Sequence, residues 1–146
     1  MSLERLPIIF VAVRRGVVPA ATAGLLYGLL QLGLPGAFVY HPARAALDYP
    51  LAFMSLAVAG FVGVRGWRSL ALAVALALLA RFACHFFSGL IFFAAYAPDW
   101  EAPWLHAATY NLLYLVPEGI LTMLLLWPLL KAYDAAFPGR GRREAS

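Results

Sequence analysis

Apolar residues fill five segments of this chain, and short polar connections separate them. The segments cover roughly residues 3–13, 17–34, 45–64, 69–95 and 107–130. A helix needs about 20 apolar residues to cross the hydrocarbon layer of a membrane. The last four segments meet that length with some tilt or interruption, whereas the first is too short unless it begins before Met1. The pattern therefore predicts a bundle of membrane helices.

Small residues recur at every fourth position of the second segment, at Ala20, Gly24 and Gly28. A face of small side chains lets membrane helices approach each other closely. Such a face can pack against another helix of the same chain or against a partner protein. We favour ordinary packing within the chain.

Composition supports the membrane assignment. Hydrophobic residues make up 64% of the chain, charged residues 12%, and the mean hydropathy is +0.81. A soluble domain carries about 25% charged residues. We therefore expect an all-α integral membrane protein, with one helical domain at 1–137 and a polar cytoplasmic tail at 138–146. The single cysteine, Cys84, excludes an internal disulfide and a multi-cysteine metal site.

The distribution of charge predicts how the helices are oriented. Basic residues cluster at 14–15, 65–68 and 131–143, and the net charge is +4. These short clusters between apolar runs suit cytoplasmic loops of a plasma membrane protein better than nucleic acid. The C-terminus is then inside, and Met1 lies outside. Because the first segment is also short, we hypothesise that a further helix precedes Met1; a genuine five-helix protein is the alternative.

Two ionisable residues are expected near the middle of the membrane, where charge is costly. Arg81 lies 12 residues beyond Ser69, which is about 18 Å along a helix. Glu118 lies 11 residues into the last segment, at a similar depth. An Arg81–Glu118 ion pair would neutralise both charges as a structural element. Asp48 is the other possible partner for Arg81.

Three further polar residues are expected in the outer third of the membrane. His85 follows Arg81 by four residues on the same helix face, and Asn111 lies two turns closer to the outside than Glu118. Asp48 is near the start of the third segment. Each alone has a packing explanation, because polar side chains often bond a neighbouring membrane helix. Their shared depth on three helices instead predicts a common site.

Aromatic residues surround this predicted site along the chain. They are Tyr49, Phe93, Tyr96, Trp100 and Trp104, which form either pocket walls or the aromatic belt of a membrane protein. A carboxylate beside aromatic rings favours an organic cation as ligand. The sequence contains no nucleotide-binding loop, no HExxH motif and no histidine pair at i, i+4. Metal-dependent catalysis is therefore not favoured, and no metal or cofactor is expected.

Five sequence stretches, in this order, resemble the thiamine transporter family. They are LPIIFVAVRRG, AGLLYGLLQ, HPARAALDYPLAF, RFACHFFSGLIFFAAYAP and TYNLLYLVPE. Members of that family are substrate-binding S components of energy-coupling factor (ECF) transporters, also described as proton-coupled thiamine transporters. The resemblance covers about residues 6–130 and implies the last five helices of a six-helix S-component bundle, with the pocket near the outer face.

The resemblance also assigns site residues. The family's acidic ligand corresponds to Asp48, beside Tyr49, and its histidine, asparagine and two aromatic positions correspond to His85, Asn111, Phe93 and Phe38. His106 stands where the family commonly has tyrosine, an exchange expected to alter selectivity or pH response. The family's first helix has no counterpart here. Its absence puts docking on the transporter's coupling protein in question more than it does thiamine binding.

The implied mechanism is thiamine capture without chemistry. An S component binds its vitamin in the lipid bilayer and docks on a membrane coupling protein that carries two ATPase subunits. Three alternatives stay open on the sequence. The ligand could be a thiamine precursor or related vitamin, the chain could be a membrane enzyme using His85, His106 and Asp48, or it could be a nonfunctional fragment.

Overall fold

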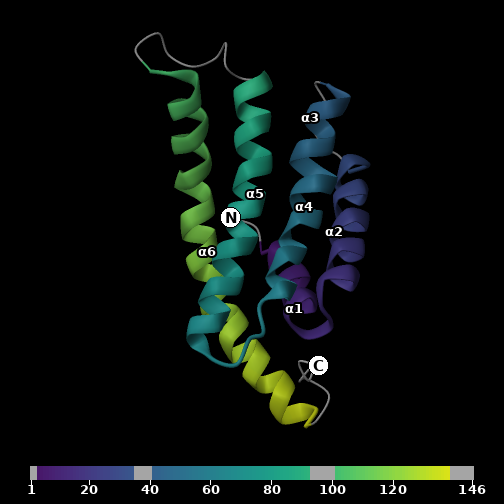
Figure 1. Ribbon diagram of the computed structural model, residues 1–146. Coiled ribbons are helices and arrows are strands. Elements are labelled where there is room, and N and C mark those ends of the chain that lie inside the picture. The colour runs from purple at the N-terminus through teal and green to yellow at the C-terminus, as the bar shows by residue number, and fades with distance from the viewer. Residues whose placement is uncertain (1–2, 35–40, 93–100, 139–146) are drawn as a thin grey trace.

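The computed structural model describes residues 3–34, 41–92 and 101–138, and all regular structure within them is helical (Figure 1). This confirms the predicted all-α class. The elements are α1 (Arg5–Arg15), α2 (Val17–Leu32), α3 (Pro42–Ala46), the π-helical turn η1 (Leu47–Leu51), α4 (Ala52–Ser55), the 3₁₀ segment η2 (Leu56–Phe61), α5 (Trp67–Phe92) and α6 (Pro103–Ala136).

Each of the five predicted segments is helical, but the third is not one regular helix. It begins as α3 and passes through η1, α4 and η2. Pro50 lies inside the π-helical turn. Proline has no backbone N–H and its ring crowds the preceding turn, so regular α-helical hydrogen bonding is interrupted there.

Two helices, α5 and α6, are long and apolar enough to cross a membrane by length and composition. The other two segments of sufficient predicted length, 17–34 and 45–64, contain a shorter helix and an interrupted one. Helix α2 is apolar but has only 16 residues, and the third segment changes helix type. Large apolar side chains on α5 and α6 remain exposed, among them Leu79 and Leu113. Such faces suit contact with hydrocarbon.

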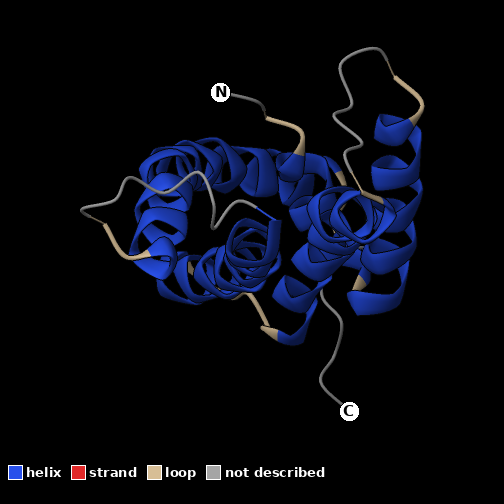
Figure 2. Cartoon of the chain, turned by 90° about the horizontal axis from the view of Figure 1, so that it is seen from above, coloured by secondary structure: helices blue, strands red, loops and turns tan. Residues whose placement is uncertain are grey.

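The long helices α5 and α6 run side by side, while α2 and the α3–α4 stack form the other side of the bundle (Figures 1 and 2). Helix α1 packs against α2, η2 and α6. The largest fully buried apolar side chains belong to Ile9, Phe53, Leu56, Leu70 and Leu126. Most of this core therefore lies towards the start of α5 and the end of α6, and the opposite half of these helices lines a cavity.

Two glycines let α2 approach the third segment backbone to backbone. A Cβ atom at Gly28 would lie 2.5 Å from Pro50 Cα, and one at Gly24 would collide with the Phe53 carbonyl. Backbone atoms cannot move aside as a flexible side chain can, so these positions require glycine. Ala20, Gly24 and Gly28 are all buried in α2. This confirms that the small-residue face serves packing within the chain.

Candidate functional site

A cavity of about 410 Å³ lies at the end of the bundle where α5 finishes and α6 begins. Small-molecule sites typically measure about 300–1,000 Å³. The lining residues come from α2, the third segment, α5 and α6: Gln31, Arg44, Asp48, Tyr49, Phe53, Arg81, His85, Ser88, Gly89, Pro103, His106, Ala107, Tyr110, Asn111 and Tyr114.

Asp48 is held in place from two sides. Its Oδ2 accepts a hydrogen bond from Arg44 Nε at 3.2 Å, one helical turn earlier. Its Oδ1 lies 3.1 Å from Nδ1 of His85, which comes from α5. Because an ionised carboxylate can only accept, Nδ1 carries the proton in this contact. The Nε2 atom of His85 is buried and has no hydrogen-bond partner among the described residues.

Asn111 is buried and its amide is oriented by its own helix. Its Nδ2 donates to the Ala107 carbonyl at 2.8 Å, and its Oδ1 accepts from the Tyr114 hydroxyl at 2.6 Å. Close packing of α5 and α6 supports this arrangement, since a Cβ at Gly89 would lie 3.2 Å from Ala107 Cβ. One amide hydrogen and one oxygen lone pair of Asn111 remain for a ligand.

The structure brings five of the predicted site residues together around one cavity: Asp48, Tyr49, His85, His106 and Asn111. His106 Nδ1 lies 2.9 Å from Glu101 Oε2, so this histidine is tied to the connection before α6. Phe38 and Phe93 lie outside the described residues, as do Tyr96 and Trp100. Trp104 is exposed and is not among the lining residues.

The predicted partner of Glu118 is wrong. Glu118 forms a buried ion pair with Arg5 at the start of α1. Arg5 lies within the first predicted segment but was not considered as a partner; it begins α1, which packs against α6. Arg81 instead places its guanidinium 4.2 Å from the centroid of the Phe53 ring. Its alternative partner, Asp48, is bound by Arg44 and His85.

Several lining residues escaped the sequence analysis. Ser88 and Tyr114 each lie three residues beyond a predicted site residue, His85 and Asn111 respectively. Residues at i and i+3 share a helix face, so this spacing could have identified both. Gln31 is a polar residue inside an apolar segment, and it donates to Glu4 at 2.8 Å and to Tyr27 at 3.0 Å. A polar residue inside an apolar segment is a sequence signal that could have identified Gln31 as a candidate site residue.

The chemistry of the cavity is that of recognition. One carboxylate, two imidazoles, two carboxamides and two guanidinium groups line a space that is also walled by Phe53 and three tyrosines. Within the described ranges, no group of three His, Cys, Asp or Glu side chains is placed to hold a metal ion. The polar groups instead present both donors and acceptors to a small molecule, beside rings whose faces attract cations.

Comparisons with known proteins agree with this arrangement. Residues 1–138 match the family described as thiamine transporter protein. The chain is 32% identical to the thiamine transporter ThiT of Bacillus subtilis over 138 residues, covering 86% of this chain and 72% of the relative. It is 31% identical to the ThiT of Lacticaseibacillus paracasei over 156 aligned positions, covering 97% and 78%.

A solved structure shares the fold. ThiT from Listeria monocytogenes superimposes with a TM-score of 0.74 at 28% sequence identity, covering 90% of this chain and 79% of that one. Together with the match over residues 1–138, this places the all-helical bundle in a family of membrane transport proteins. The chain belongs to the thiamine transporter protein family.

Proposed function

We propose that this chain binds thiamine in the cavity between the third segment, α5 and α6. The observation that carries the proposal is the Asp48 carboxylate, held by Arg44 and His85 at the wall of an aromatic cavity. A carboxylate among aromatic faces suits an organic cation, because charge and ring quadrupole attract it together. Thiamine carries such a charge on its thiazolium ring.

The second ring of thiamine accounts for the remaining polar groups. Its aminopyrimidine presents an amino donor and ring-nitrogen acceptors, which match Asp48, His85 and Asn111 as a set. Matching matters here because an unpaired polar group buried with the ligand costs about 1–3 kcal/mol. Tyr49 and His106 complete the proposed site, as do Phe38 and Phe93, which lie outside the described residues.

The proposed binding step serves import across the plasma membrane. We propose that the chain is the substrate-specific S component of an ECF-type transporter, with ATP hydrolysed by two separate subunits on a membrane coupling protein. The basic clusters support an orientation with the C-terminus in the cytoplasm. In cells that supply these subunits, thiamine uptake should require ATP hydrolysis; uptake that ignores ATPase-inactivating mutations would contradict this coupling.

The binding proposal is tested by titrating thiamine into the detergent-purified chain and measuring heat or quenching of intrinsic fluorescence. Asp48→Asn and His85→Ala should each weaken binding by about 5- to 150-fold, the equivalent of about 1–3 kcal/mol. Matched controls are Asp134→Asn and His41→Ala, which lie outside the cavity lining and should leave affinity unchanged. Unaltered affinity in both cavity variants would refute the site.

A second candidate ligand is the pyrimidine precursor of thiamine. The observation that favours it is His106, which lines the cavity where the family commonly has tyrosine and is bound to Glu101. The same titration is therefore run with the precursor alone. Tighter binding of the precursor than of thiamine would replace the first proposal with the second.

A further inference from the structure

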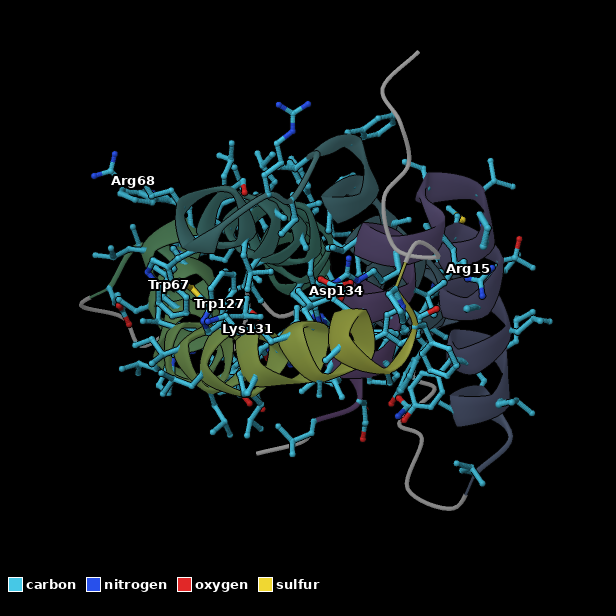
Figure 3. The ribbon with its side chains drawn as sticks, turned by 90° about the horizontal axis from the view of Figure 1, so that it is seen from below. Arg15, Trp67, Arg68, Trp127, Lys131 and Asp134 are labelled. Atoms are coloured by element: carbon cyan, nitrogen blue, oxygen red, sulfur yellow. The ribbon has the colours of Figure 1, made fainter. Side chains whose placement is uncertain are left out.

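Cations and tryptophans gather at the end of the bundle opposite the cavity (Figure 3). We define the basic aromatic patch as Trp67, Arg68, Trp127 and Lys131, together with Arg65 in the turn before α5. Figure 3 shows Trp67, Trp127 and Lys131 together, Arg68 beside Trp67, and Arg15 across the bundle from them. All of the patch residues except the half-buried Trp127 are exposed.

Two helices build the patch through a defined packing contact. The rings of Trp67, at the start of α5, and Trp127, on α6, meet edge to face with centroids 5.8 Å apart. Lys131, one turn after Trp127, holds its Nζ atom 4.9 Å from the Trp127 ring centroid. Ser69 Oγ accepts hydrogen bonds from the backbone N–H groups of Arg65 and Gly66, which ties the preceding turn to α5. The patch is therefore a fixed surface feature.

The positive charge of the patch is not neutralised by nearby acids. Among the described residues, Lys131, Arg65 and Arg68 form no salt bridge. Asp134, the acid on the next turn of α6, is occupied by Arg14 at 2.7 Å. The indole N–H groups of Trp67 and Trp127 also have no hydrogen-bond partner in the described part of the chain. The patch thus offers one ammonium, two guanidinium groups and two indole donors, but no acceptor side chain.

Exposed leucines adjoin this set of donors. Leu72 and Leu76 follow Arg68 at i+4 and i+8 along one face of α5, and Leu124 precedes Trp127 by three residues on one face of α6; all three are exposed. A ligand that binds both the donors of the patch and the exposed leucines has an anionic, oxygen-rich headgroup and apolar chains. Tryptophan side chains favour the same boundary between headgroups and hydrocarbon.

We propose that the basic aromatic patch binds the headgroup of an anionic phospholipid, with its acyl chains along the exposed leucines of α5 and α6. The donors of the patch match phosphate oxygens, and its cations match the charge. This site is separate from the cavity and does not depend on which vitamin the cavity holds.

The test compares two lipids that differ only in headgroup charge. The full chain is purified in a neutral detergent, and native mass spectrometry measures retained dioleoyl-phosphatidylglycerol against dioleoyl-phosphatidylcholine. We expect retention to favour phosphatidylglycerol, and Lys131→Gln and Arg68→Gln each to lower that preference about fivefold, since one cation near a membrane surface contributes about that factor. Trp127→Leu should lower it as well.

Arg15→Gln is the matched control, because it removes one exposed cation at the same end but on the far side of the bundle. An equal loss in Arg15→Gln and Lys131→Gln would mean that overall charge acts instead of a site, and would overturn the proposal. Equal retention of the two lipids would also overturn the phospholipid proposal. An acidic protein surface would then be the expected partner of the basic aromatic patch. Should a variant misfold, raising NaCl from about 0.05 M to about 0.5 M must weaken the preference of the unchanged chain.

Discussion

At the scale of single residues, the cavity is organised before any ligand arrives. Asp48 is fixed by Arg44 and His85, and the Asn111 amide is fixed by Ala107 and Tyr114. A side chain already held in one orientation loses little conformational freedom on binding, which favours affinity. The hydroxyl of Tyr114 therefore contributes by holding Asn111 in position.

Tyr114→Phe should test that positioning role. The variant keeps the ring but removes the donor to Asn111 Oδ1, so the amide is held only by its hydrogen bond to the Ala107 carbonyl. We expect thiamine affinity to fall by about 2- to 12-fold, the equivalent of about 0.5–1.5 kcal/mol for one hydrogen bond. Calorimetric titration measures this change. Tyr110→Phe is the control, because Tyr110 also lines the cavity but is exposed; equal losses in both variants would contradict the positioning role.

At the scale of elements, hydropathy predicted where helices lie but not their internal form. The apolar runs identified all five segments, because a helix that lies in lipid needs a sufficiently long run of apolar residues. The same runs could not show that the third segment changes from α to π to 3₁₀ geometry, although Pro50 signalled a disturbance. Helix α6 begins at Pro103 and ends at Ala136, beyond both predicted limits, because polar residues continue a helix outside the apolar run.

The close approach of α2 to Pro50 predicts that a larger side chain on α2 will displace the turn η1. Gly28→Ala should push α2 away from η1, the turn that carries Asp48, because its new methyl group would meet backbone. Overpacking of this kind costs about 1–3 kcal/mol. We expect a lower unfolding temperature and weaker thiamine binding together.

Gly33→Ala supplies the comparison at the end of the same helix. A Cβ there would lie 3.5 Å from the Leu30 carbonyl oxygen, an ordinary contact. This variant should unfold and bind as the unchanged chain does. A Gly28→Ala protein with unchanged melting and affinity would show that α2 and η1 are not packed as described.

At the scale of the whole molecule, depth along helices could be predicted from sequence, whereas partners across helices could not. Counting residues from the membrane boundary placed Asp48, His85 and Asn111 at one level, and these three side chains line one cavity. Whether they bind thiamine stays a proposal. The partner of Glu118 depends on which helices touch, and periodicity does not encode that contact.

Breaking the Arg5–Glu118 pair on one side should destabilise the protein strongly, because both groups are buried and the remaining charge would lose its partner. Arg5→Met leaves the Glu118 carboxylate without its arginine and should cost about 3–5 kcal/mol. The double variant Arg5→Met with Glu118→Leu should recover much of that loss, since no isolated charge remains. Denaturant unfolding in detergent, followed by circular dichroism, measures both.

Asp134→Asn breaks an ion pair of a different kind and serves as the comparison. The Asp134 side chain is 53% exposed, so its pairing with Arg14 should contribute less than about 1 kcal/mol. Similar costs for Arg5→Met and Asp134→Asn would mean that burial does not set the strength of these pairs.

The pairing of Arg5 with Glu118 also constrains how the chain is made. Arg5 leaves the ribosome more than one hundred residues before Glu118, which corresponds to roughly 6 to 20 seconds of synthesis. Arg5 is the first residue of α1 and is buried, and an arginine without a partner is costly in hydrocarbon. Helix α1 should therefore reach its final position only after α6 has been inserted.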